Sequence, residues 1–146
     1  MHRALCLSGL TPTALMFAPL ASQLDGRAEL ILKDLEGYAP DFPDDYGPEV
    51  ELAAIKHGAD AAGWDVFHLI GSSFGATVGL AFACRYPERV LSLALIEPVF
   101  LGNDTSWSDA YAALVTSLNA VLGAPLVDRP HAFPEGTLLR TGCTTG

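Results

Sequence analysis

The chain has 146 residues, enough for one domain with a substantial core but short for two. Half of the residues are hydrophobic and only 17% are charged, which excludes a disordered chain. Eight Lys and Arg residues against 17 Asp and Glu residues give a net charge of −9. Nucleic acids and anionic lipids bind clusters of Lys and Arg, and this acidic sequence has no such cluster. We therefore expect neither a nucleic-acid partner nor a membrane partner.

The cysteines and the N-terminus bear on the cellular compartment. Cys6, Cys84 and Cys143 are odd in number and contain no Cys-x-x-Cys pair, which argues against a disulfide framework and a thiolate metal site. No apolar stretch reaches the length of a membrane span. Residues 1–21 share features with a secretory signal peptide, but the polar and turn-forming residues from Ser8 to Thr13 fit a strand, loop and helix better. We therefore expect a cytoplasmic protein.

Short apolar runs and helix-boundary residues predict alternating strands and helices. In chain order, the first half has a strand at Arg3–Gly9, a helix near Thr13–Leu24 with Thr13 as the cap, a strand at Glu29–Lys33, a loop at Asp34–Gly47 and a helix at Pro48–Gly63. The second half has a strand at Val66–Gly71, a helix at Phe74–Tyr86, a strand at Leu91–Ile96 and a helix at Thr105–Leu122.

This alternation predicts an α/β protein, a three-layer αβα sandwich around a mostly parallel sheet. The run Leu91–Ile96 is apolar at nearly every position, which is typical of a strand covered on both faces. We expect residues 1–127 to form the domain and residues 128–146, which lack a sustained period, to form a loose tail. In parallel sheets the chemistry lies beyond the carboxyl ends of the strands. The candidate site therefore lies in the loops that begin near Gly9, Asp34, Gly71 and Glu97.

One of these loops carries a motif. Gly71-Ser72-Ser73-Phe74-Gly75 fits Gly-x-Ser-x-Gly and lies between a predicted strand and a predicted helix, where a sharp turn presents the Ser73 hydroxyl above the sheet. The backbone N–H of Phe74 is then placed to bind an oxyanion at the helix N-terminus. The alternative interpretation is a glycine-rich turn without chemistry. The strand before the motif and the helix after it favour a nucleophile.

Several segments resemble the α/β-hydrolase superfamily, in its serine-nucleophile form. They are the motif within His68–Gly75, the run Arg85–Val90, the strand end Ile96–Phe100, and the upstream segments Leu7–Leu10 and Asp34–Ala39. The segment Leu7–Leu10 is similar to the family's first oxyanion loop, and this likeness implies that the N–H of Leu10 is the second oxyanion donor beside Phe74. We expect Asp34 to brace its own loop through hydrogen bonds.

The sequence also departs from the family pattern. Ser8 and Ser72 stand where the family often has His. In the family an acid and the catalytic His follow the Ser in the chain, whereas only about fifty residues follow Leu95 here. His131 is the single His after Ser73 and so the candidate base, although its place in the tail also fits a solvated loop residue. The available acids are Glu97, Asp104, Asp109 and Asp128. The chain therefore resembles the N-terminal half of a hydrolase, an incomplete fold from a truncated or frame-shifted product.

The resemblance implies a hydrolase that cleaves an ester or similar acyl bond of a small molecule, with Ser73 as nucleophile and no metal or cofactor. Nucleotide binding fails two tests, because Ser73 and Ala76 replace glycines of the dinucleotide pattern and Ala76-Thr77 replaces the Gly-Lys of a P-loop. The remaining alternative is an inactive fragment or a partner-binding α/β module. Such a fragment would self-associate through an exposed sheet edge at Leu91–Ile96.

Overall fold

The computed structural model describes residues 1–9, 14–38, 46–99, 116 and 139–141. The strands are β1 (His2–Leu7), β2 (Ala28–Lys33), β3 (Phe67–Ser72), β4 (Val90–Ile96) and β5 (Leu139–Thr141). The α-helices are α1 (Ala18–Gln23), α2 (Pro48–Ala61) and α3 (Phe74–Arg85), and three short 3-10 helices are η1 (Ala14–Phe17), η2 (Glu36–Tyr38) and η3 (Pro87–Arg89).

The described strands form one sheet in the order β4-β3-β1-β2-β5. The pairs among β1, β2, β3 and β4 are all parallel, whereas β5 pairs with β2 in the antiparallel sense. The prediction of an α/β fold with a mostly parallel sheet is confirmed. Strand β5 lies in the segment that the sequence analysis treats as a loose tail, and its three residues are too few to show a periodic pattern.

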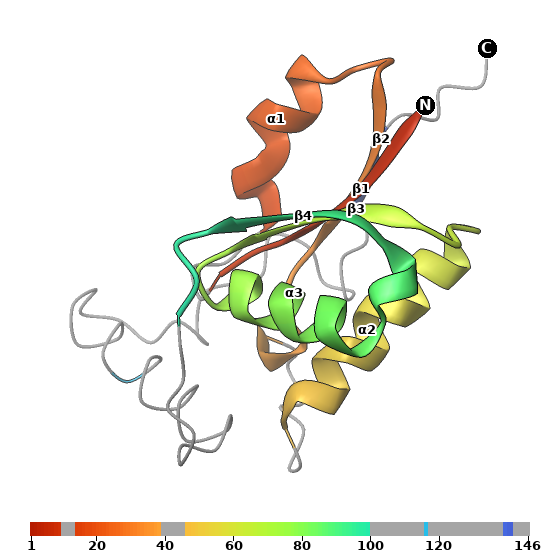
Figure 1. Cartoon of the computed structure of the whole chain (residues 1–146). Helices are drawn as coiled ribbons and strands as arrows, with labels where there is room; N and C mark the ends of the chain where they lie inside the picture. The colour runs from red at the N-terminus through yellow and green to blue at the C-terminus, as the bar shows by residue number, and fades with distance from the viewer. Residues whose placement is uncertain (10–13, 39–45, 100–115, 117–138, 142–146) are drawn as a thin grey trace.

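Helices cover the sheet on both faces (Figure 1). Helix α1 lies on one side, where Phe17 and Ala14 of η1 pack on Cys6 and Leu32. Helices α2 and α3 lie on the other side and bury the larger part of the core. Its fully buried side chains on that side include Leu5, Leu7, Ile55, Trp64, Phe67, Leu69 and Phe82. These layers form the predicted αβα arrangement and fix the carboxyl ends of β1, β2 and β3 side by side.

The first predicted helix differs most from its prediction. The segment begins with the 3-10 helix η1 and becomes α-helical only at Ala18, after an N-terminal cap at Phe17 that makes no side-chain hydrogen bond. Pro19 at the start of α1 explains this boundary, because proline fits the first turn of a helix but not its interior. The predicted cap Thr13 lies outside the described residues, as does nearly all of the predicted helix 105–122.

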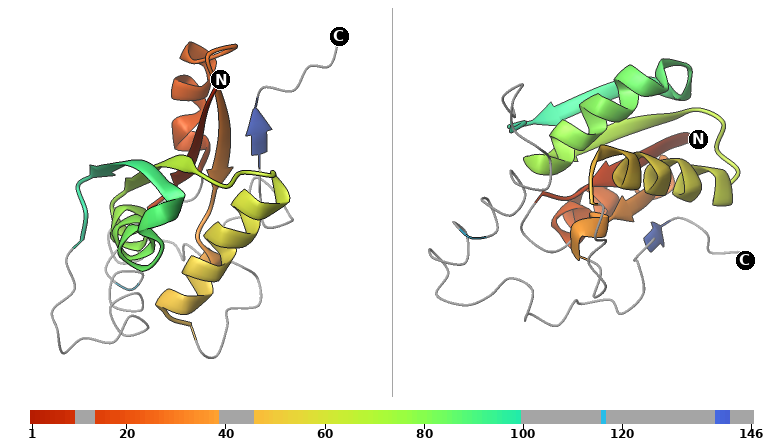
Figure 2. Two further views of the ribbon diagram at one scale, coloured as in Figure 1. Left: turned by 45° about the vertical axis from the view of Figure 1, so that its right-hand side comes forward. Right: turned by 90° about the horizontal axis from the view of Figure 1, so that it is seen from below.

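Strand β4 is the edge of the described sheet and is not covered on both faces, so that prediction is wrong. Leu91 is 58% exposed and Ile96 is 47% exposed. Figure 2 shows β4 at the margin of the sheet, opposite the side on which β5 lies. The core cluster that α1 joins draws on β1, β2 and β3 and includes no residue of β4. The apolar character of β4 thus leaves an exposed apolar edge rather than a second core layer.

Candidate active site

The predicted turn at Ser73 joins β3 directly to α3. Ser73 has φ 54° and ψ −121°, a left-handed conformation that a non-glycine residue adopts at a cost of roughly 1–3 kcal/mol. Its carbonyl accepts hydrogen bonds from the backbone N–H groups of Ala76 and Thr77, which begins the helix. Its own N–H donates to the carbonyl of Ile96 at 2.8 Å, which fastens the turn to the end of β4. Strand and helix therefore meet at a sharply bent, half-buried serine.

The glycines two residues before and after Ser73 permit this bend. A Cβ atom added at Gly71 would lie 2.5 Å from the carbonyl oxygen of Gly75. A Cβ atom added at Gly75 would lie 2.1 Å from the carbonyl oxygen of Ser8, at the end of β1. Both distances are far below van der Waals contact, so any side chain at either position forces the backbone apart. The spacing Gly-x-Ser-x-Gly is thus required by the close approach of β1, β3 and α3.

The segment after β1 lies directly against the serine. A Cβ atom added at Gly9 would lie 2.9 Å from the Cβ of Ser73. The buried Ser8 hydroxyl donates a hydrogen bond of 3.1 Å to the Asp34 carboxylate, and the same carboxylate oxygen accepts the backbone N–H of Ala14. The sequence predicts that Asp34 braces its own loop, whereas these bonds of its carboxylate hold two other segments, the residue after β1 and the start of η1. The sequence analysis did not identify Ser8 as the partner of Asp34. The strand register explains the contact: Leu7 of β1 pairs with Lys33 of β2, so the residues that follow them, Ser8 and Asp34, lie side by side.

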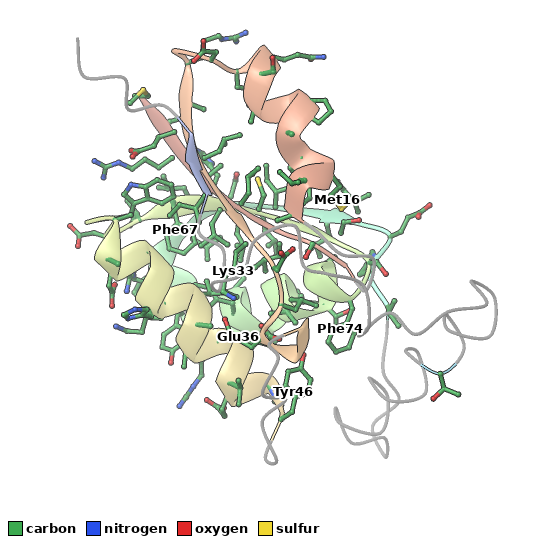
Figure 3. All side chains as sticks on the ribbon, turned by 180° about the vertical axis from the view of Figure 1, so that it is seen from behind. Met16, Lys33, Glu36, Tyr46, Phe67 and Phe74 are labelled. Carbon is green, nitrogen blue, oxygen red and sulfur yellow. The ribbon has the colours of Figure 1, made fainter. Side chains whose placement is uncertain are left out.

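A second polar cluster lies below the end of β2. The Lys33 ammonium group donates to the Glu36 carboxylate at 2.7 Å and to the carbonyl of Asp34 at 2.8 Å (Figure 3). The fully buried Glu51 carboxylate accepts the Tyr46 hydroxyl at 2.8 Å and the N–H of Gly37 at 3.3 Å. Burial raises the pKa of Glu51, and the positive charge of Lys33 and the Tyr46 hydrogen bond oppose this shift in part. The cluster ties η2 to α2 and supports the loop that begins at Asp34.

The segment that follows β4 also lies beside the start of α3. Glu97, which the sequence analysis names as a candidate acid, is exposed and has φ 49°. The Thr77 hydroxyl in the first turn of α3 donates a hydrogen bond to the carbonyl of Val99. Thus the carboxyl ends of β1, β3 and β4 contact the start of α3, and the end of β2 joins them through the Asp34–Ser8 hydrogen bond, at the edge where the fold predicts a site.

The other candidate residues are separated or lie outside the described ranges. Leu10, His131, Asp104, Asp109 and Asp128 lie outside the described residues. Among the described histidines, His57 is exposed on α2 and His2 is at the exposed start of β1. The third, His68, lies five residues before Ser73, and five residues of extended strand place the two on the order of 15 Å apart. The Nδ1 atom of His68 forms a hydrogen bond of 2.8 Å with the Ser92 hydroxyl instead. Within the described residues, the Ser73 hydroxyl thus has no histidine partner.

Among the described residues, neither a metal-binding cluster nor the thiol of Cys6 offers a reactive centre beside the serine. The described residues contain no group of three or more His, Cys, Asp or Glu side chains arranged to hold a metal ion. Cys6 is fully buried in β1, and burial raises the pKa of its thiol to about 12, so it stays protonated at neutral pH. In the part of the chain that the structure describes, each helix is too short or too polar to cross a bilayer.

Comparison with known proteins identifies the family. The family model described as alpha/beta hydrolase fold matches residues 5–123, and this range contains the sharp turn, both neighbouring strand ends and Asp34. The chain belongs to the α/β hydrolase fold family, which confirms the resemblance drawn from the sequence.

Curated relatives in this family are hydrolases. The chain is 33% identical over 144 residues to a human serine hydrolase-like protein, and the match covers 93% of this chain and 70% of that protein. A second human relative, serine hydrolase-like protein 2, is also 33% identical, and the match covers 45% of its length. A 2-hydroxy-6-oxo-6-phenylhexa-2,4-dienoate hydrolase of Comamonas testosteroni is 35% identical over 82 residues, which cover 54% of this chain and 29% of that enzyme.

Solved structures share the fold. A meta-cleavage product hydrolase from Pseudomonas fluorescens superposes with a TM-score of 0.63 at 23% identity, over 84% of this chain and 44% of that chain. An epoxide hydrolase from Bacillus megaterium superposes with a TM-score of 0.62 at 24% identity, over 67% of this chain and 36% of that chain. The chain therefore spans between about a third and a half of these enzymes.

Proposed function

We propose that the protein is a serine hydrolase that cleaves an ester or similar acyl bond, with Ser73 as the nucleophile. The observation that carries the proposal is the backbone of Ser73, a non-glycine residue at φ 54° between two glycines that no side chain could replace. A strained conformation of this kind persists only where the surrounding structure enforces it, and it is concentrated at functional sites. The human serine hydrolase-like relatives support the same choice of nucleophile.

The reaction that this geometry supports is acyl transfer. A general base takes the proton of the Ser73 hydroxyl while Oγ attacks the acyl carbon, and the carbonyl oxygen becomes an oxyanion. Phe74 is the first residue of α3, so its N–H points toward the N-terminal end of the helix, where negative charge is stabilised. The N–H of Leu10 is the proposed second donor. When the intermediate collapses, the acyl–oxygen bond breaks and the protonated base gives its proton to the leaving alcohol. The base then takes a proton from water, which attacks the acyl-serine ester, and returns it to Ser73 as the acid is released.

The proposed base is His131, because it is the single histidine after Ser73 in the chain. Its candidate acid partners are Glu97, Asp104, Asp109 and Asp128. The proposed substrate is a small molecule, and the proposed location is the cytoplasm. The named substrate of the Comamonas relative, a 2-hydroxy-6-oxo-dienoate, makes small oxo acids a second substrate class to assay beside simple esters.

Covalent labelling tests the nucleophile. A fluorophosphonate probe should modify the wild-type chain, and Ser73→Ala should abolish the labelling. The matched control is Ser72→Ala, which removes the neighbouring, similarly half-buried hydroxyl and should leave the labelling intact. Labelling that survives in Ser73→Ala and is lost in Ser72→Ala would contradict the assignment of Ser73.

The alternative function is a non-catalytic α/β module, and one observation favours it. The described residues place no histidine beside Ser73. Turnover of p-nitrophenyl esters separates the two functions. Activity above a heat-treated control that is lost in both Ser73→Ala and His131→Ala supports the hydrolase, whereas no turnover by a folded chain supports the module.

A further inference from the structure

One carboxylate oxygen joins two segments beside the serine. Asp34 follows β2 directly, and its Oδ1 accepts both the Ser8 hydroxyl and the backbone N–H of Ala14. Ser8 is the residue that follows β1, and Ala14 is the first residue of η1. The two donors come from residues 26 and 20 positions away in the sequence, so this contact is tertiary and not part of a local turn.

The residues that Asp34 holds are packed against both sides of Ser73. The carbonyl oxygen of Ser8 abuts Gly75, since an added Cβ there would lie only 2.1 Å away. The next residue, Gly9, abuts Ser73 itself, since its added Cβ would lie 2.9 Å from the Ser73 Cβ. The Ser8–Gly9 backbone therefore packs directly on the turn, and a shift toward the turn would collide with Gly75 or Ser73.

The Asp34 carboxylate is not engaged by the neighbouring ammonium group, because Lys33 pairs with Glu36. The Lys33 ammonium group bonds Glu36 and the main-chain carbonyl of Asp34, not the Asp34 carboxylate. The carboxylate instead accepts two neutral donors, and hydrogen bonds to a charged acceptor are stronger than those between neutral groups. It is half-buried, so water screens these bonds only in part.

We propose that Asp34 is a positioning residue for Ser73, acting through the Ser8–Gly9 backbone. The inference rests on the proposed function, which makes Ser73 the reacting group. Asp34 holds Ser8 and Gly9 against the sharp turn, and this contact fixes the direction of the Ser73 side chain. Misplacing a reacting group by about 1 Å costs on the order of a hundredfold in rate, so a loosened contact at Gly9 has a measurable effect.

The first test compares Asp34→Ala with Asp34→Asn. The measured quantity is the second-order rate constant of fluorophosphonate labelling, in buffer where denaturation curves show each variant folded. Asp34→Ala should slow labelling about tenfold, while Asp34→Asn, which keeps an oxygen acceptor, should restore most of the rate. Asp25→Ala, at an exposed position beyond α1, is the matched control and should label at the wild-type rate. A purely structural Asp34 would lower stability but leave the rate of the folded protein unchanged.

A second test does not depend on hydrolysis. Ser73→Cys is made with Cys84 and Cys143 replaced by Ser, and the rate of iodoacetamide alkylation is followed against pH; the buried Cys6 stays protonated. Adding Asp34→Ala should change this rate at least threefold, and adding Asp25→Ala should not.

The two tests fail in different ways. If the wild type is not labelled by fluorophosphonate but alkylation still responds to Asp34→Ala, the proposed function is wrong and the positioning role holds. If neither rate responds in folded protein, the positioning role is wrong. Should Asp34→Ala not fold, Ser8→Ala removes one of its two donors and should change both rates in the same direction by a smaller factor.

Discussion

The β1–β3 region and the β4 edge of the same sheet differ in how completely they are covered. Around the serine, Leu5, Leu7 and Leu69 are fully buried and the neighbouring backbone segments touch. At β4, Leu91 and Ile96 leave about half of their surfaces exposed. The contacts that shape the turn are thus complete within the described residues, whereas the contacts that would cover a parallel strand on both faces are not. In the described residues, the turn at Ser73 is thus tightly packed, whereas the apolar side chains of the neighbouring edge strand β4 are partly exposed.

The largest expected effect on stability is at the tightly packed turn around Ser73. Gly75→Ala should lower the free energy of unfolding by about 3 kcal/mol or prevent folding, because its methyl group would overlap the Ser8 carbonyl. Gly79→Ala, one turn further along α3, is the matched control: its methyl group would lie 3.6 Å from Leu69, an ordinary contact. It should be neutral or stabilise the helix by about 0.5–1 kcal/mol. Equal effects in urea denaturation would show that the close approach at Gly75 does not exist.

A smaller effect concerns the buried carboxyl group below the site. The folded-state pKa of Glu51 is raised, so the folded protein holds this proton more tightly than the unfolded chain does. Its contribution to stability is present at low pH and is lost as pH rises through the folded pKa. Glu51→Gln does not titrate and should therefore gain stability relative to the wild type as pH rises above 4.5, the ordinary value for a glutamate.

Urea denaturation over this pH range measures the difference directly. Glu49→Gln, an exposed substitution in the first turn of the same helix, is the matched control. A difference for Glu51→Gln that does not grow with pH would contradict the raised pKa.

The smallest effect on stability is expected at β4, the exposed edge of the described sheet. A substitution there should mainly change self-association. Val90–Ile96 contains neither a charge nor a proline, the features that usually prevent edge-to-edge pairing. Two copies could pair in the antiparallel sense about Leu93, which would bring Leu91 of one copy opposite Leu95 of the other. Leu91→Lys should change stability by less than about 0.5 kcal/mol and weaken self-association.

Sedimentation velocity at several concentrations follows that association. Met16→Lys, at an exposed apolar residue of η1 on the far side of the sheet, is the control and should leave it unchanged. A wild type that stays monomeric at every concentration would contradict pairing through β4.

The sequence predicted the parts of this fold that depend on local patterns. The buried strands and α2 and α3 follow from apolar runs, from Pro48 at a helix start and from the Gly-x-Ser-x-Gly spacing. The composition of β4 left both a covered strand and an exposed edge open, because an apolar strand looks the same whether or not a neighbour covers it. The link from Asp34 to Ser8 required the register of β1 on β2, which brings together residues 26 positions apart.

The most direct measurement of the central claim is the position of the covalent adduct. After reaction with a fluorophosphonate, the chain is digested and the peptides are analysed by mass spectrometry. The account predicts one modified peptide that contains the β3–α3 junction, with the added mass on Ser73. An adduct confined to another residue, or no adduct on a chain shown to be folded, would contradict it.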